Sequence, residues 1–263
     1  MPEYAILNDL SKCMGCRACQ TACKGWNGLP GDKMTQKGTY QNPPELNAHT
    51  WTLIHFNEIA DDKGRVKWLF RKEQCYHCKD AACADVCPAP GAIFKTKEGA
   101  VVIDQDKCIG CKYCINACPY GIPRFDPETE KVFKCTFCYD RLQGDMVPAC
   151  AKTCPSHALQ FGERDRIIEI AKKRVKELGG DTSLYGEKSL GGAHYMYVLP
   201  EKAMMYAGLP TNPYYPVTVT LWRNIVRPLS LVSFLGAIGV SWLYYISKGP
   251  KKGGKEEGNG KEQ

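Results

Sequence analysis

The sequence predicts an α+β fold in which a cysteine-rich domain of two nested modules precedes one C-terminal transmembrane helix. Two observations carry this prediction. The sixteen cysteines of the 263-residue chain fall into four runs of four, and none is left over. Near the C-terminus, the stretch from Leu229 to Ile246 contains no charged residue. The runs indicate an internal repeat, and the uncharged stretch indicates a membrane segment.

The four cysteine runs have the spacing that holds [4Fe–4S] clusters. Three of them end in Cys-Pro, at Pro88, Pro119 and Pro155. This is the bacterial ferredoxin signature, in which the fourth thiolate binds a different cluster from the first three. Sixteen thiolates at four per cluster make room for four clusters. The runs are Cys13, Cys16, Cys19 and Cys23; Cys75, Cys78, Cys83 and Cys87; Cys108, Cys111, Cys114 and Cys118; and Cys135, Cys138, Cys150 and Cys154.

Zinc sites and disulfides fit the cysteine pattern less well. Zinc sites usually pair two Cys-x2-Cys knuckles a dozen or more residues apart. Disulfide frameworks belong to small secreted proteins, and the segment from Met1 to Leu10 lacks the apolar region of a signal peptide. We therefore expect iron–sulfur ligation. Because the energy of binding each cluster counts as folding energy, we also expect the chain without iron to be poorly folded.

Exchange of the fourth ligand predicts two nested ferredoxin-like modules. The inner module covers residues 72–125 and lies within an outer module that spans residues 1–161. The predicted ligand sets are Cys13, Cys16, Cys19 and Cys154 for cluster 1; Cys23, Cys135, Cys138 and Cys150 for cluster 2; Cys75, Cys78, Cys83 and Cys118 for cluster 3; and Cys87, Cys108, Cys111 and Cys114 for cluster 4.

The remaining sequence predicts a few regular elements around the cysteines. Residues 51–59 and 66–71 flank a polar turn and favour a hairpin, and residues 92–95 with 100–103 favour a second one. Short helical turns are expected after the third ligand of each run. An extension over residues 162–206 should hold an amphipathic helix at 163–178 and a strand at 194–199.

The C-terminal part reads as a linker, a membrane span and a tail. Prolines make residues 207–224 a stiff linker, and residues 225–247 are the predicted transmembrane helix. Its eighteen uncharged residues would span about 27 Å, the lower limit for crossing a bilayer, so a helix in a soluble core remains the alternative. Trp222, Trp242, Tyr244 and Tyr245 have the positions of an aromatic belt. The glycine-rich charged tail, residues 248–263, is predicted to be disordered.

Basic residues predict the orientation of this span in the cytoplasmic membrane. Arg223 and Arg227 precede it, and five lysines follow it. The positive-inside rule then places the C-terminus in the cytoplasm and the cysteine domain in the periplasm. A partner subunit with a twin-arginine signal could export the folded domain together with itself. The lysines are Lys248, Lys251, Lys252, Lys255 and Lys261.

The formal charge of +7 does not indicate nucleic-acid binding. Each oxidised cluster with its four thiolates carries about −2, so four of them bring the loaded chain near −1. No base-stacking pattern accompanies the basic residues. Lysines next to the ligands either offset the cluster charge, which would raise reduction potentials, or are simply solvated. These lysines are Lys12, Lys24, Lys107, Lys112 and Lys134.

Nothing in the sequence indicates catalysis by this chain. It has no nucleotide-binding glycine fingerprint, P-loop or serine elbow. The histidines show no pair at helical ligand spacing, so structural roles are expected, although His77 could tune a cluster because it lies inside the second run. The predicted role is therefore electron transfer. The histidines are His49, His55, His77, His157 and His194.

Several stretches resemble the iron–sulfur β subunit of membrane-bound respiratory formate dehydrogenase, N type. They are Cys-Met-Gly-Cys-Arg-Ala-Cys-Gln-Thr-Ala-Cys-Lys-Gly-Trp-Asn (13–27), Cys-Ile-Gly-Cys-Lys-Tyr-Cys (108–114), Lys-Cys-Thr-Phe-Cys-Tyr-Asp-Arg (134–141), Pro-Ala-Cys-Ala-Lys-Thr-Cys-Pro (148–155), Gly-Gly-Ala-His-Tyr-Met-Tyr-Val-Leu (191–199) and Gly-Leu-Pro (208–210). The likeness covers nearly the whole chain. One departure is the short N-terminal lead before Cys13, which would trim contacts with partners.

The resemblance implies a heterotrimer, with further oligomerisation open. A catalytic subunit with a molybdopterin or tungstopterin cofactor would oxidise formate, and a cytochrome b subunit would reduce quinone. Electrons would enter at cluster 1 and leave at cluster 4, and the terminal helix would dock on the cytochrome. The cysteine runs alone would also fit a membrane hydrogenase, a polysulfide or thiosulfate reductase, or a free-standing membrane-tethered ferredoxin.

Overall fold

The computed structural model describes residues 2–33, 35, 38–60 and 63–249 and divides the chain into two compact units. Unit 1 is Met1–Val219 and unit 2 is Thr220–Gln263. The tail that the sequence predicts to be disordered lies outside the described residues from position 250 onward. Unit 1 contains every cysteine of the chain, so each predicted cluster site belongs to a single compact body.

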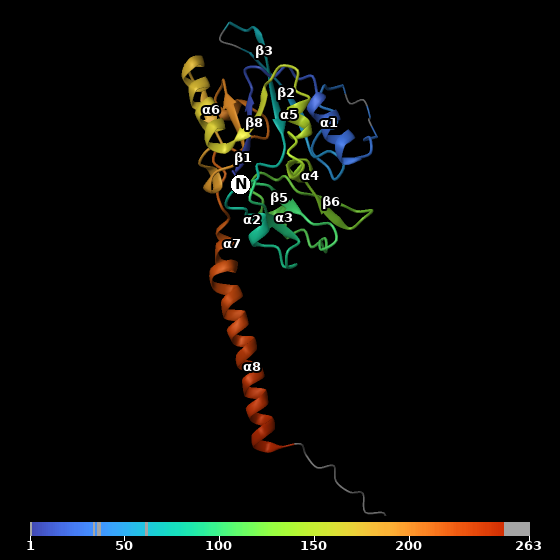
Figure 1. Cartoon of the computed structure of the whole chain (residues 1–263), viewed down its shortest axis with the longest axis vertical. Coiled ribbons are helices and arrows are strands. Elements are labelled where there is room, and N and C mark those ends of the chain that lie inside the picture. The colour runs from blue at the N-terminus through green and yellow to red at the C-terminus, as the bar shows by residue number, and fades with distance from the viewer. Residues whose placement is uncertain (1, 34, 36–37, 61–62, 250–263) are drawn as a thin grey trace, which may run out of the picture. The chain divides into compact units, whose positions relative to one another are not determined.

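A four-stranded sheet joins the two ends of unit 1 (Figure 1). Its strand order is β8-β1-β10-β9. Strand β1 pairs in parallel with β10 and antiparallel with β8, and β9 pairs antiparallel with β10. The N-terminal lead before the first cysteine therefore forms a central strand. The strands are β1 (Tyr4–Asp9), β8 (Leu159–Glu163), β9 (Ser183–Tyr185) and β10 (Tyr195–Leu199).

The two faces of this sheet pack against different partners. Because side chains alternate along a strand, Ala5 and Leu7 of β1 share one face while Ile6 lies on the other. Helix α6 (Arg164–Leu178) covers the first face through Ile167 and Ala171. The opposite face belongs to the main core, which also contains buried cysteines from three of the four runs. The sheet thus separates a cysteine-free layer from the layer that carries the thiols.

Three two-stranded hairpins complete the strands of unit 1. The two hairpins that the sequence predicts are confirmed as β2 with β3 and β4 with β5, and the strand predicted at 194–199 is confirmed as β10. The third hairpin, β6 with β7, has no sequence-based prediction. The strands are β2 (Leu53–Ala60), β3 (Val66–Glu73), β4 (Ile93–Lys95), β5 (Val101–Ile103), β6 (Arg124–Asp126) and β7 (Lys131–Phe133).

Short helices carry the third cysteine of each run. They are α1 (Ala18–Asn27), α2 (Ala82–Asp85), α3 (Tyr113–Ala117) and α5 (Ala149–Lys152). The predicted helix at 163–178 is confirmed as α6, whose last residue is followed by Gly179 with φ 63°. Helix α4 (Tyr139–Gln143) follows Cys138, and 3-10 turns occupy Ser189–Gly191 and Ala203–Met205.

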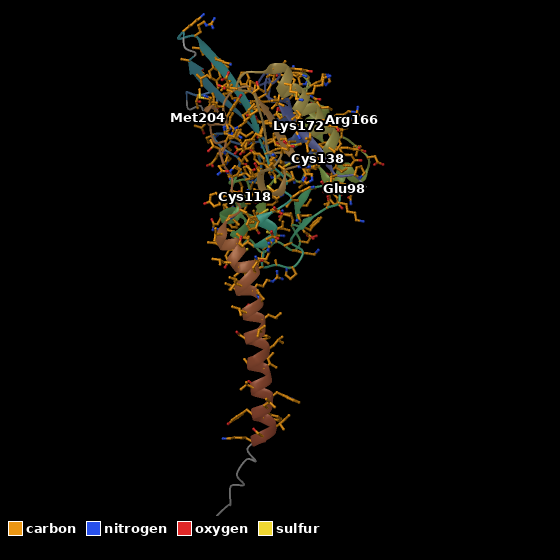
Figure 2. All side chains as sticks on the ribbon, turned by 90° about the vertical axis from the view of Figure 1, so that its left-hand side faces the viewer. Glu98, Cys118, Cys138, Arg166, Lys172 and Met204 are labelled. Atoms are coloured by element: carbon orange, nitrogen blue, oxygen red, sulfur yellow. The ribbon has the colours of Figure 1, made fainter. Side chains whose placement is uncertain are left out.

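One long apolar helix begins at Val217 and continues through unit 2 to Lys248. It consists of α7 (Val217–Leu221), a π-helical turn at Trp222–Val226 and α8 (Arg227–Lys248). Pro228 lacks the N–H that would bond to the carbonyl of Asn224, which accounts for the π turn beside it. The helix is long and apolar enough to cross a membrane, and its most apolar window is uncovered in the chain (Figure 2). Its first residue lies inside the stretch predicted as a linker, directly after Pro216, where proline favours a helix start.

Candidate functional site

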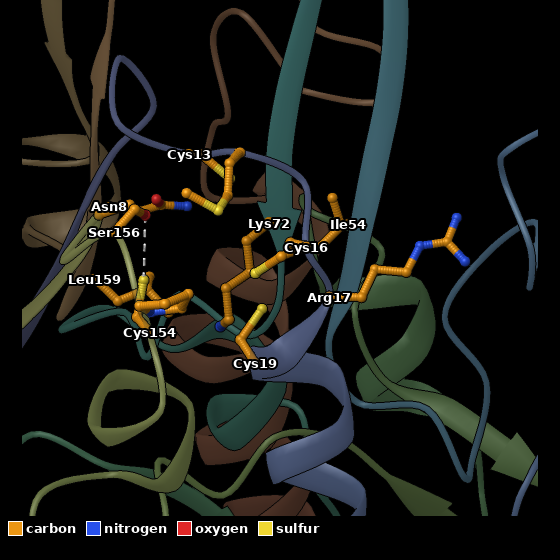
Figure 3. Close-up of a pocket in the computed structure, with 13 residues that line it drawn as sticks. Asn8, Cys13, Cys16, Arg17, Cys19, Ile54, Lys72, Cys154, Ser156 and Leu159 are labelled. Atoms are coloured by element: carbon orange, nitrogen blue, oxygen red, sulfur yellow. Dashed lines mark hydrogen bonds between the residues drawn. The ribbon is translucent and has the colours of Figure 1, made fainter.

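Three hollows in unit 1 are each lined by four cysteines. Their volumes are similar, about 330, 380 and 310 Å³, and part of each is open to solvent. Their cysteines are those predicted for clusters 1, 3 and 4: Cys13, Cys16, Cys19 and Cys154; Cys75, Cys78, Cys83 and Cys118; and Cys87, Cys108, Cys111 and Cys114. Figure 3 shows the first hollow, with Lys72 among the thiols and Arg17 pointing away from them.

The fourth predicted set, Cys23, Cys135, Cys138 and Cys150, is buried as a group. Burial, with the thiolates of Cys150 and Cys23 close by, raises the pKa of Cys138 to about 12. Burial and the thiolates of Cys135 and Cys150 likewise raise the pKa of Cys23 to about 12. The structure therefore brings together each of the four predicted sets of cysteines.

Burial makes two more of these thiols, Cys19 of set 1 and Cys114 of set 4, harder to ionise. Burial raises the pKa of Cys19 and of Cys114 to about 12, and neighbouring thiolates add to the rise. Metal coordination requires the thiolate, so iron binding at these sites must release protons.

The backbone turns the same way before the second cysteine of every run. Gly15, His77, Gly110 and Phe137 have φ of 67°, 48°, 66° and 63°. A left-handed conformation costs a non-glycine residue about 1–2 kcal/mol. It aims backbone N–H groups at the first cysteine: the amide of His77 lies 3.5 Å from Cys75 Sγ, and that of Phe137 lies 3.4 Å from Cys135 Sγ. Such N–H···S bonds stabilise a charged sulfur.

Two buried N–H donors fit an acceptor that the polypeptide does not supply. His77 Nδ1 accepts from the amide of Val101 at 3.0 Å, and burial holds the pKa of His77 well below its usual range. The neutral ring therefore carries its proton on Nε2. That atom and Gln74 Nε2 have no hydrogen-bond partner among the described residues. Both residues flank Cys75, and with four thiols per hollow they fit the sulfur atoms of a [4Fe–4S] cluster.

No group of three or more His, Cys, Asp or Glu side chains in the described part of the chain closes around a single metal ion.

Two of the histidines for which structural roles are predicted have close polar partners within the chain. His55 Nε2 lies 2.6 Å from Glu73, and His194 Nδ1 lies 2.6 Å from the carbonyl of His77.

The four thiol sets follow one another in the order 1, 2, 3, 4. Helix α1 carries Cys19 of set 1 and Cys23 of set 2, one helical turn apart. The second and third sets meet at Cys135 and Cys75, because the thiolate of Cys75 raises the pKa of Cys135. The Phe137 ring also lies 4.8 Å from the His77 ring at this junction. The third and fourth sets are joined by Cys83 and Cys87, which are also four residues apart, although only Cys83 lies in a helix, α2.

The two ends of this row each have an exposed apolar residue beside them. Cys16 of set 1 is exposed. The residue after the first cysteine is apolar and exposed at both ends, with Met14 57% and Ile109 67% accessible. The equivalent Tyr76 in the second run is only 2% accessible. An apolar side chain is therefore exposed beside sets 1 and 4, whereas the equivalent side chain of the second run is buried.

The five lysines noted beside the ligands have different environments. Lys12, Lys24 and Lys107 lie 3.9, 3.0 and 2.9 Å from the carboxylates of Asp9, Asp32 and Asp104. Lys112 is exposed, with its Nζ 3.7 Å from the centre of the Phe125 ring. Lys134 alone among the five is buried.

Lys72 is a second buried lysine, and the sequence did not predict it. It lies in strand β3, three residues before Cys75, a position that carries no sequence signal for burial. Burial alone would lower the pKa of Lys72, but the thiolates of Cys150 and Cys19 raise it above its usual value. The thiolates of Cys75 and Cys83 raise the pKa of Lys134 against burial in the same way.

Comparison with known proteins places these cysteines in a family. Models of the 4Fe-4S dicluster domain match residues 12–92 and 66–164, and a model of the formate dehydrogenase N transmembrane region matches residues 216–258. The formate dehydrogenase-O iron-sulfur subunit of Escherichia coli is 42% identical over 98% of this chain and 87% of its own length. The nitrate-inducible formate dehydrogenase iron-sulfur subunit of the same organism is 40% identical over 95% of this chain and 87% of its own length. The chain belongs to the family of formate dehydrogenase iron–sulfur subunits.

One relative has a name that mentions cytochrome c-553. The β subunit of formate dehydrogenase 2 (cytochrome c-553) of Nitratidesulfovibrio vulgaris is 42% identical over 67% of this chain and 84% of its own length.

Family membership confirms several of the sequence-based predictions. The fold is α+β, with two 4Fe-4S dicluster domains and one C-terminal apolar helix suited to a single membrane pass. The chain is the electron-transfer component of an oxidoreductase and performs no catalysis of its own. Its sixteen cysteines fit four [4Fe–4S] clusters. Each cluster would supply one-electron chemistry at its site, and the thiols, backbone amides and lysines of this chain would hold it.

Proposed function

We propose that this formate dehydrogenase subunit conducts electrons through four [4Fe–4S] clusters from a molybdopterin or tungstopterin catalytic subunit to a cytochrome b subunit that reduces quinone. The observation that supports it is the row of four thiol sets with an exposed apolar residue, Met14 or Ile109, beside the set at each end. The proposed ligands are Cys13, Cys16, Cys19 and Cys154 for cluster 1; Cys23, Cys135, Cys138 and Cys150 for cluster 2; Cys75, Cys78, Cys83 and Cys118 for cluster 3; and Cys87, Cys108, Cys111 and Cys114 for cluster 4.

The exit of the chain from unit 1 supports a direction for this transfer. Val219, the last residue of unit 1, packs with Ala82 of α2 and Ala117 of α3. Tyr215 also donates a hydrogen bond to Asp85 at 2.8 Å. The connection to the apolar helix therefore starts at the inner module. We assign cluster 4 as the exit towards the membrane and cluster 1 as the entry from the catalytic subunit.

The proposed assembly is a heterotrimer in the cytoplasmic membrane, with unit 1 in the periplasm. Arg223 and Arg227 on one side of the span against five lysines on the other support a cytoplasmic C-terminus. A twin-arginine signal on the catalytic partner would export the folded pair.

The test of this function is purification of the complex from membranes with mass identification of each subunit. We expect a pterin-bearing subunit, a cytochrome b and formate-dependent reduction of an artificial dye. A pure complex without a pterin-bearing subunit, or one that reduces dye with hydrogen and not with formate, would refute the proposal.

The ligand assignment predicts that two neighbouring cysteines bind different clusters. Cys154→Ser should disturb cluster 1, whose other proposed ligands are Cys13, Cys16 and Cys19, and Cys150→Ser should disturb cluster 2. Both substitutions lie in or beside α5, so each is the control for the other. Electron paramagnetic resonance of the reduced complex should lose a different signal in each variant. Loss of the same signal in both variants would contradict the pairing.

A further inference from the structure

Two lysines are buried in the cluster domain without a carboxylate. Lys72 is 1% and Lys134 is 4% accessible. Lys72 Nζ donates to Gln74 Oε1 and lies 4.9 Å from the centre of the Tyr195 ring. Lys134 Nζ donates to the carbonyls of Val101 and Cys135. All of these partners are neutral, and no ion pair in the described part of the chain includes either lysine.

Each lysine lies beside thiols of two different sets. The positive charge of Lys72 interacts electrostatically with Cys19 of set 1 and with Cys23, Cys135 and Cys150 of set 2. Its side chain lines the hollow of set 1 (Figure 3). Lys134 lines the hollow of set 3, where it acts on Cys75, Cys83 and Cys118, and it also acts on Cys135 of set 2. One lysine therefore occupies the junction of sets 1 and 2, and the other occupies the junction of sets 2 and 3.

The repeat shows that this burial is selective. Lysine stands directly before the first cysteine in three runs, as Lys12, Lys107 and Lys134, and Gln74 has that place in the second run. Lys12 and Lys107 are exposed, and each pairs with a carboxylate, that of Asp9 or Asp104. Lys134 turns inward, and Gln74 holds the ammonium of Lys72. In the hollow of set 4, the lysine is the exposed Lys112.

A buried ammonium without a carboxylate is costly unless another negative charge compensates it. The thiolate-bound clusters are the negative groups at both junctions. Reduction adds one more negative charge to a cluster, so a fixed positive charge nearby favours the reduced state. Because each lysine faces two sets, it acts on two clusters at once.

We infer that the positive charges of Lys72 and Lys134 set the reduction potentials along the relay. Lys72 raises the potentials of clusters 1 and 2, and Lys134 raises those of clusters 2 and 3. Cluster 4 faces neither lysine and is left lower. Clusters 1, 2 and 3 would each be raised in potential, and cluster 2, which faces both lysines, would be raised most. This inference rests on the proposed function, because it takes the four-cluster relay and its ligand sets as given.

The experiment is an anaerobic redox titration, followed by electron paramagnetic resonance, of the complex with Lys72→Met or Lys134→Met. Methionine keeps most of the length of the side chain and removes the charge. Each variant should make two of the four midpoint potentials more negative. At a fixed applied potential, the ratio of reduced to oxidised cluster should fall at least tenfold, which corresponds to a shift of 59 mV for a one-electron couple. One potential should move in both variants, and one should move in neither.

Two further sets of variants keep the result interpretable. Lys107→Met, at the same repeat position as Lys134 but exposed and paired with Asp104, should leave all four potentials in place. Lys72→Arg and Lys134→Arg keep the charge and should restore the potentials towards those of the unaltered complex. A methionine variant that loses iron can be compared with the arginine variant at the same position. About sixteen irons in the arginine variant would support the role of the positive charge, and loss of iron in both variants would overturn the inference.

The outcomes separate the inference from the function on which it rests. Fewer than four components in the unaltered complex would contradict the relay itself. Four components with no shift in either methionine variant, or an equal shift of all four, would contradict only the role of the lysines.

Discussion

At the scale of single residues, the left-handed position before the second cysteine links backbone geometry to cluster binding. Glycine occupies it in the first and third runs, and His77 and Phe137 occupy it in the other two. Those two larger side chains are buried and lie against each other between sets 2 and 3. Packing at the centre of the row therefore offsets the backbone strain, whereas Gly15 and Gly110 avoid the strain near the ends.

The glycine position gives a prediction with a matched control. A Cβ at Gly110 would lie 2.0 Å from the backbone oxygen of Glu130, so Gly110→Ala must displace the turn that carries Cys108 and Cys111. Gly121 has nearly the same φ, 59° against 66°, and open space around it. We expect Gly121→Ala to cost about 1–2 kcal/mol of backbone strain with full iron loading. Gly110→Ala should lose cluster 4 and about four irons per chain, measured by iron analysis. Equal iron contents in the two variants would contradict this account.

Residue-scale features differ in how far sequence alone predicts them. The cysteine sets follow from the ferredoxin spacing, and the structure brings each set together. Lys72 could not be predicted, because its burial depends on Gln74 and on Tyr195, which is more than a hundred residues away. The left-handed Phe137 was equally hidden, since an aromatic residue rarely adopts positive φ, and the enrichment of histidine at positive φ is too small to single out His77.

At the scale of elements, local patterns predicted the hairpins and α6, but the sheet that closes unit 1 needed distant partners. Strand β1 pairs with β8 and β10, more than 150 residues further along the chain. A six-residue segment before the first cysteine has no local turn or periodicity that reveals such pairing. The N-terminal lead, which appeared only as a shortened extension, is therefore a central strand of the fold.

The apolar helix predicts a position-dependent cost for a charge. Ile238 lies near the middle of the uncharged stretch and Tyr245 near its end, and both are exposed on α8. Arginine at the centre of a span costs about 2.5–3.5 kcal/mol on the insertion scale, whereas near an end it can reach the interface. We expect Ile238→Arg to reduce the fraction that resists carbonate extraction from membranes, and Tyr245→Arg to retain it. Iron content should stay unchanged in both, because unit 1 has its own core. Equal extraction of the two variants would argue against a membrane span.

At the scale of the whole molecule, cysteines that would hold the iron–sulfur clusters are part of the hydrophobic core. The main group of buried apolar residues includes cysteines such as Cys19, Cys75 and Cys135. The second hydrophobic cluster, between α6 and one face of the sheet, contains no cysteine among its described members. We therefore expect one layer of unit 1 to depend on iron for its stability, because metal-binding energy there is folding energy, and the other layer to be held by ordinary apolar packing.

This division predicts an uneven response to iron removal. After anaerobic chelation, peptides that cover residues 13–27 and 108–118 should exchange their amide hydrogens rapidly, because their turns are held by thiolate ligation. Helix α6 and strands β1 and β10 should keep more protection, since Ile167, Ala171 and Leu7 remain packed without any contribution from a cluster. Hydrogen exchange with mass analysis measures both sets of peptides in one sample, and the loaded complex provides the reference. If α6 exchanges as fast as the cysteine runs after chelation, the cysteine-free layer depends on iron as well, and unit 1 is a single cooperative unit.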